Sequence, residues 1–87
     1  MRLTLLHREG CGLCEEMLAE LETLKSTRTL PPIDLVEVDR DAELNRRYGL
    51  NIPVLLLDGT FVCRHHLDPE ELARLLRART LRAPPSV

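Results

Sequence analysis

The stretch that decides the fold of this chain is RLTLLHREGCGLC, residues 2–14. It begins with a short apolar run at residues 2–6, which is typical of a buried strand. From Leu13 onward, apolar side chains recur at helical spacing and predict an amphipathic helix of about three turns. Two cysteines, Cys11 and Cys14, therefore lie where a strand passes into a helix.

A second strand and a short helix are expected next. Residues 33–38 are rich in β-branched side chains and predict the strand. Asp39 or Asp41 is expected to cap a helix that ends at Gly49, because aspartate accepts hydrogen bonds from a first turn and glycine commonly follows a last one. The strand-helix-strand order implies that the first two strands are parallel, with a right-handed crossover.

The clearest local signal is Asp58-Gly59, which joins the apolar runs at residues 54–57 and 60–63. Both turn residues tolerate positive φ, so the sequence predicts a two-residue hairpin between antiparallel strands. The last helix is expected to open at Asp68-Pro69, a capping residue followed by a proline in the first helical position.

These elements combine into an α/β fold in the order β-α-β-α-β-β-α, with a mixed four-stranded sheet and helices on both faces. With 87 residues, the chain has room for one small domain. We expect the domain to span residues 1–80 and residues 81–87 to form a flexible C-terminal tail. Leucine must supply most of the core, because Tyr48 and Phe61 are the only aromatic residues.

Charge and hydropathy exclude several function classes. Twelve basic and fourteen acidic residues give a net charge of −2, without the basic excess that a nucleic-acid-binding domain needs. No apolar run approaches the ~20 residues that span a bilayer. The apolar N-terminal run meets His7 too early for a signal peptide. We therefore expect a cytoplasmic protein that binds neither nucleic acid nor membranes.

The three cysteines carry the functional hypothesis. Stable structural disulfides are rare in a reducing cytosol, so the Cys11-x-x-Cys14 pair indicates redox chemistry or half of a metal site. A helix N-terminus favours the thiolate, which is the nucleophilic form, so the pKa of Cys11 is expected below the ordinary ~8.5. Cys11 is then the candidate nucleophile and Cys14 the resolving thiol, while Cys63 is expected to be a core residue.

Several interpretations of these residues stay open. A thiol–disulfide oxidoreductase would need no bound cofactor, only an external thiol reductant such as glutathione or a reductase. A metal-binding module would use Cys11, Cys14, Cys63 and His65 for zinc, or share an iron–sulfur cluster between two chains. An interaction module would keep the fold without turnover. In the simplest alternative, Cys14 is a small buried apolar residue and Cys11 an incidental loop thiol.

The sequence resembles the thioredoxin fold and, more narrowly, its glutaredoxin-like branch. Three features carry the resemblance. The first is Cys11-Gly12-Leu13-Cys14 after a short strand, the second is Asp39 and Leu44 followed by the segment at residues 48–54, and the third is the Asp58-Gly59 hairpin before a final helix. Together they cover residues 2 to about 80. The resemblance implies a disulfide oxidoreductase that acts as a monomer on a disulfide-containing protein or a small thiol.

The resemblance also implies a substrate-binding surface. Pro53 would be cis and, with the backbone of Ile52, would face the cysteine pair beside Gly12 and Leu13. Arg8, three positions before Cys11, would hold a glutathione carboxylate, although a solvated surface arginine is the competing interpretation.

The chain departs from the glutaredoxin pattern at three places. Gly12 and Leu13 replace a proline and an aromatic residue, Ile52 replaces a threonine, and His65-His66-Leu67 replaces a glycine pair. The fold and the dithiol therefore carry over better than glutathione specificity does.

Overall fold

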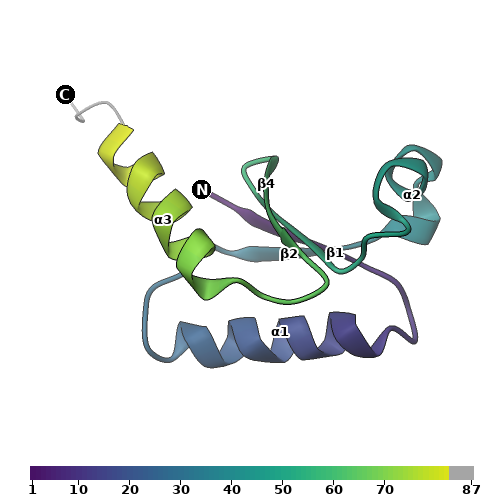
Figure 1. The fold of residues 1–87 in the computed structure, drawn as a ribbon, viewed down its shortest axis with the longest axis horizontal. Coiled ribbons are helices and arrows are strands. Elements are labelled where there is room, and N and C mark those ends of the chain that lie inside the picture. The colour runs from purple at the N-terminus through teal and green to yellow at the C-terminus, as the bar shows by residue number, and fades with distance from the viewer. Residues whose placement is uncertain (83–87) are drawn as a thin grey trace.

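A computed structural model describes residues 1–82 of the chain, and Figure 1 shows its sheet with a long helix running beneath it. The elements are, in chain order, β1 (Leu3–His7), α1 (Gly12–Lys25), β2 (Ile33–Glu37), the 3-10 helix η1 (Val38–Arg40), α2 (Ala42–Tyr48), β3 (Val54–Leu57), β4 (Thr60–Arg64) and α3 (Pro69–Arg82). The predicted order β-α-β-α-β-β-α is confirmed, with η1 as an addition. No helix within these 82 residues is both long and apolar enough to cross a membrane.

The sheet is mixed, as predicted, with the strand order β2-β1-β3-β4. β1 lies in the interior of the sheet and pairs parallel with β2, in a register that joins Leu3 to Ile33 and His7 to Glu37. On its other side β1 pairs antiparallel with β3. Every residue of β3 is buried, because this interior strand is covered on both faces.

Helices cover both faces of the sheet, and each face has its own apolar cluster. α1 and α3 pack on one face, where the buried members are Leu3, Leu5, Met17, Leu21, Leu55, Leu57, Val62, Cys63 and Leu72. α2 packs on the other face near one end of the sheet, over the buried side chains of Leu6, Val38, Val54 and Leu56. Leucine fills most of these positions, as the scarcity of aromatic residues predicts.

Aspartates begin two of the helices. The Asp68 carboxylate accepts the Glu71 N–H at 3.0 Å, so α3 opens where the sequence predicts. The Asp41 carboxylate accepts the N–H groups of Glu43 and Leu44 at 2.9 and 3.1 Å. Asp41 is thus the cap of α2, which leaves Asp39 free for a different contact.

The β3–β4 hairpin turns at Asp58 and Gly59, whose φ angles are 48° and 82°. Positive φ at both positions is the conformation that a two-residue hairpin turn requires, and it confirms the prediction. The register shifts between Leu55 and Leu56, so that Val62 is the extra residue of a bulge. The bulge explains why Val62 and its neighbour Cys63 are both buried.

Several element boundaries differ by one or two residues from the sequence-based expectation. β1 begins and ends one residue later than predicted. β2 stops at Glu37, because Val38 begins a 3-10 turn. In this turn the Asp41 N–H donates to the Val38 carbonyl at 3.2 Å. α3 continues to Arg82, two residues past the expected domain boundary, since no proline or glycine lies between Pro69 and Pro84. The expected flexible tail otherwise falls on residues 83–87, outside the described part of the chain.

Candidate functional site

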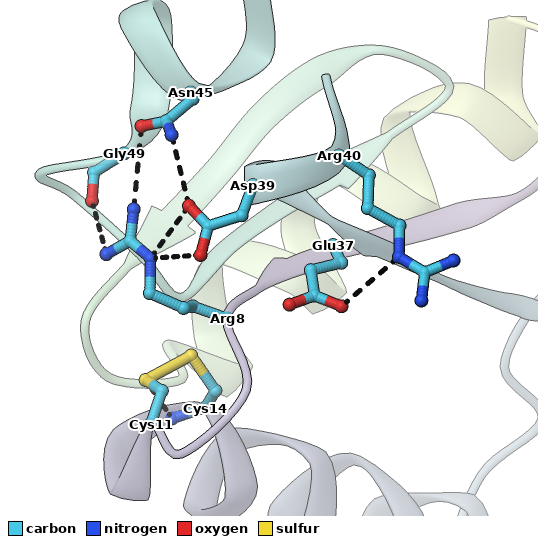
Figure 2. A network of polar contacts seen from close by, with 8 residues as sticks. All are labelled: Arg8, Cys11, Cys14, Glu37, Asp39, Arg40, Asn45 and Gly49. Carbon is cyan, nitrogen blue, oxygen red and sulfur yellow. Dashed lines mark hydrogen bonds and ion pairs between the residues drawn. A yellow bond between two sulfur atoms is a disulfide. The ribbon is translucent and has the colours of Figure 1, made fainter. Parts of the chain in front are cut away.

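The cysteine pair lies at the first turn of α1, where Cys11 is the N-cap residue with extended backbone (φ −92°, ψ 107°). The Cys11 Sγ accepts the Cys14 N–H at 3.1 Å, so the sulfur itself satisfies one of the free donors at the helix start. A disulfide bond joins the two residues, whose Cα atoms are 5.2 Å apart (Figure 2). The predicted position of the pair, after a strand and at a helix start, is confirmed.

The two sulfurs differ in access. Cys11 is partly exposed, whereas only 5% of Cys14 is accessible. Gly12 and Leu13 are both exposed between them, and Leu13 presents 39% of its surface. A molecule that approaches from solvent therefore meets Cys11 first, while Cys14 lies behind it against the core.

A small hollow of about 170 Å³ adjoins Cys14 on the side of β2. The hollow is lined by Glu9, Glu15 and His7 and by apolar side chains that include Leu18 and Leu35. Glu9 and Glu15 are both exposed, so two carboxylates flank the first turn of α1.

The Arg8 guanidinium is occupied by contacts within the protein. Its Nε donates to both carboxylate oxygens of Asp39, at 3.0 and 2.9 Å. One terminal nitrogen reaches the Gly49 carbonyl at 3.3 Å, and the other reaches the Asn45 side-chain oxygen at 3.5 Å. The Asn45 amide in turn donates to Asp39 at 3.0 Å. Figure 2 shows the guanidinium turned toward these three residues, with the disulfide below the stem of the Arg8 side chain.

Gly49 is a glycine for a different reason from the one expected. Its φ of −54° is ordinary right-handed backbone, so it does not provide a left-handed helix end. A side chain at this position would instead collide with Asn45 and would come within 3.3 Å of the Arg8 guanidinium. The glycine therefore allows a close approach of the chain to the Arg8 contacts.

The loop from Gly49 to β3 contains the expected cis peptide bond between Ile52 and Pro53. The Pro53 carbonyl accepts the His65 N–H at 2.8 Å, which joins this loop to the end of β4. Within the described residues, Ile52 makes no loop hydrogen bond through its own N–H or C=O. Leu50, at the start of the loop, is 97% exposed.

Cys63 lies apart from this site. It is a free thiol with 7% of its surface accessible, and it belongs to the core cluster beneath α1 and α3. Burial raises the pKa of its thiol, because the charged form would lose its hydration. Across residues 1–82, no group of three or more His, Cys, Asp or Glu side chains is placed to hold a metal ion, so the suggested zinc set of Cys11, Cys14, Cys63 and His65 does not assemble.

Comparison with known proteins places the chain in a family. A family model described as "Glutaredoxin-like domain (DUF836)" matches residues 2–77, which is most of the chain. The chain belongs to this glutaredoxin-like family. The resemblance noted in the sequence is thereby confirmed at the level of the family.

Solved structures of similar fold are known. A Nitrosomonas europaea protein is 30% identical, with a TM-score of 0.75 over 85% of this chain and 88% of its own. An X. campestris protein is 34% identical, with a TM-score of 0.62 over 87% of this chain and 96% of its own. E. coli glutaredoxin shares the fold at 15% identity, with a TM-score of 0.55 over 91% of this chain and 96% of its own.

Sequence analysis did not find the partners of Arg8. No local sequence pattern links Arg8 to Asp39 or Asn45, although both lie within hydrogen-bond distance of the guanidinium. The missing signal was the parallel register, because pairing of His7 with Glu37 brings the residues that follow the two strands to one end of the sheet.

Proposed function

We propose that the protein is a thiol–disulfide oxidoreductase whose working groups are Cys11 and Cys14. The observation that supports this proposal is the unequal access of the two bonded sulfurs at the start of α1. Cys11 caps the helix and is partly exposed, and Cys14 is buried behind it within bonding distance. Reduced Cys11 is then the nucleophile, and Cys14 is the resolving thiol.

The reaction proceeds by two thiolate attacks. Cys11 thiolate attacks one sulfur of a substrate disulfide, forms a mixed disulfide with it and releases the other sulfur as a thiolate. Cys14, as a thiolate, then attacks the Cys11 sulfur, closes the Cys11–Cys14 bond and releases the remaining substrate thiolate. Both released thiolates take up protons. The substrate gains two electrons and the dithiol loses two, which an external thiol reductant restores.

The start of α1 favours the thiolate on Cys11. The Cys14 N–H already points at the Cys11 Sγ, and free backbone N–H groups at a helix start stabilise negative charge. The Arg8–Asp39 pair contributes little net charge, and Glu9 and Glu15 oppose the anion. The backbone is therefore the group that activates Cys11.

The substrate binds beside Cys11, on the exposed surface of Gly12 and Leu13 and along the backbone of Ile52 before Pro53. Within residues 1–82 the N–H and C=O of Ile52 have no backbone partner, which suits an extended peptide or a thiol compound that hydrogen-bonds as an added strand would. The substrate is a disulfide-containing protein or a small thiol in the cytoplasm. The protein acts as a monomer and needs no bound cofactor. Neither nucleic acid nor a membrane is a partner. Glutathione or a reductase returns the oxidised protein to the dithiol state.

Three cysteine variants test the proposal. Wild-type protein and Cys63→Ala should both reduce a disulfide substrate with dithiothreitol as reductant, because Cys63 lies in the core. Cys11→Ser should show only the uncatalysed rate. Cys14→Ser, reduced and then freed of dithiothreitol before the substrate is added, should keep the first attack and accumulate a mixed disulfide on Cys11, which intact-mass spectrometry detects. Full activity of Cys11→Ser, or wild-type protein inactive with every disulfide tried, would exclude this function.

Equilibration against glutathione redox buffers provides a second, independent measurement. A reversible oxidation that involves two electrons and needs both Cys11 and Cys14 is the expected result, read from the reduced fraction at each buffer ratio. A pair that stays oxidised or reduced across all accessible ratios would be a structural element and not a working dithiol.

A further inference from the structure

The contacts of Arg8 suggest a role other than substrate binding. Arg8 reaches the dithiol through its backbone, because its carbonyl accepts the Cys11 N–H at 3.2 Å and closes the turn before α1. Its side chain extends toward Asp39 in η1 and toward Asn45 and Gly49 at the end of α2 (Figure 2). One residue therefore holds the turn that carries Cys11 and contacts the segment that leads to Pro53.

The segment after α2 has few other contacts of this kind. Gly49, whose carbonyl Arg8 contacts, is followed by the fully exposed Leu50. Further along, the Asn51 N–H donates to the Tyr48 carbonyl at 2.8 Å, and the Asn51 side chain accepts from Arg64 at 3.1 Å. The bond from the Arg8 guanidinium to the Gly49 carbonyl, at 3.3 Å, joins this segment to the β1–α1 turn.

The charge of Arg8 is also balanced inside the protein. Asp39 accepts two hydrogen bonds from Nε and is itself oriented by Asn45. A substrate carboxylate would have to compete with Asp39 at close range, and Glu9 lies one residue away from Arg8 in the turn. The environment of the guanidinium therefore opposes a further anion.

We propose that Arg8 is a positioning residue that holds the Cys11 turn and the Gly49–Pro53 segment in fixed relation, and that it does not bind a substrate carboxylate. This inference rests on the proposed oxidoreductase function. Asp39 and Asn45 share the role, because they orient the guanidinium toward Gly49. The distance between the attacking sulfur and the substrate-binding backbone depends on this network, so its loss weakens catalysis for every disulfide alike.

The experiment compares two substrates that differ in charge. Oxidised glutathione and its carboxyl-esterified form have the same peptide backbone, with and without carboxylates. kcat/KM is measured for each with wild type, Arg8→Gln, Arg8→Lys and Asp39→Asn. Arg2→Gln is the matched control, because Arg2 also binds an aspartate, Asp34, through Nε and one terminal nitrogen, and it lies at the other end of β1 from the cysteine turn.

If Arg8 is a positioning residue, the variants Arg8→Gln, Arg8→Lys and Asp39→Asn should all lower kcat/KM by about tenfold or more, because misplacement of reacting groups by about 1 Å can lower the rate up to a hundredfold. Each variant should lower kcat/KM by the same factor for both substrates. Lysine does not rescue, because one ammonium cannot reach Asp39 and Gly49 together. Arg2→Gln keeps the wild-type rates. If Arg8 instead binds a substrate carboxylate, Arg8→Gln should lower kcat/KM for oxidised glutathione alone, and Arg8→Lys should restore part of it. Asp39→Asn should then raise kcat/KM, because it frees the Arg8 guanidinium.

Two readouts separate positioning from a loss of folding. Iodoacetamide should alkylate Cys11 of reduced Arg8→Gln at the wild-type rate, because this small reagent does not use the Gly49–Pro53 segment. Cys63 should stay as slow to react as in wild type, since it is exposed only when the core opens. Unchanged kcat/KM in Arg8→Gln, substrate-selective loss, or fast Cys63 alkylation overturns the inference. Inactive wild-type protein would instead contradict the proposed function.

Discussion

Cys63 shows how strongly burial separates one thiol from the others. Its pKa is raised because the thiolate would lose hydration inside the core, and the thiolate is the form that reacts. In reduced protein at pH 8, we expect iodoacetamide to label Cys11 first and Cys63 last, as measured by peptide mapping over time. Labelling of Cys63 as fast as a free cysteine would contradict its burial; addition of denaturant provides the positive control.

Gly49 is the glycine whose replacement should cost most. Gly49→Ala forces a methyl group against Asn45 and the Arg8 guanidinium, and such overpacking costs typically about 1–3 kcal/mol. We expect a lower urea midpoint and lower disulfide-reducing activity. Gly12→Ala is the stability control, since a methyl group there meets nothing within 4 Å. Equal stability of both alanine variants would show that the chain adjusts at Gly49 without cost.

At the scale of elements, the α3 cap is the simplest test of local structure. Asp68→Ala removes the acceptor of the Glu71 N–H and should lower the unfolding free energy by about 1 kcal/mol. Asp68→Asn should retain most of the stability, because asparagine caps equally well. Urea denaturation monitored by circular dichroism measures both. A loss in Asp68→Asn as large as in Asp68→Ala would indicate that the negative charge, and not the cap, stabilises α3.

Elements with local signals could be predicted, and contacts between distant residues could not. The Asp58-Gly59 turn and the Asp68-Pro69 helix start each depend on the conformations of adjacent residues, and both lie where the sequence placed them. The position of the cysteine pair at the start of α1 likewise follows from the strand-to-helix junction in the sequence. The Arg8–Asp39 pair spans 31 residues, so its existence depends on the sheet register, which no local pattern encodes.

At the scale of the whole molecule, acid should weaken the fold. Hydrogen bonds from Arg2 lower the pKa of Asp34, and those from Arg74 lower the pKa of Glu71. A carboxyl with a lower pKa in the folded state stabilises the protein fully above its unfolded pKa of ~4, and this contribution is lost as pH falls through the folded pKa. We expect the urea midpoint to hold between about pH 6 and 5 and to fall below about pH 4.

Asp34→Asn tests which carboxyl contributes. It should lower the midpoint at pH 6 and show a smaller further loss at low pH, because the titrating group is gone. Glu22→Gln, which removes a longer ion pair of 3.7 Å with Lys25, should follow the wild-type profile. An Asp34→Asn profile parallel to wild type would mean that the pair with Arg2 does not couple to folding.

The two arginine–aspartate pairs also bear on how β1 finds its alignment. Arg2 precedes β1 and binds Asp34 within β2, while Arg8 follows β1 and binds Asp39 just beyond β2. A slide of β1 by two residues, about 6.6 Å, would keep every side chain on its own face, so the leucines alone discriminate poorly against it. The same slide would separate both pairs at once. Charges at the two ends of one strand thus select a single alignment from several that the apolar core would accept.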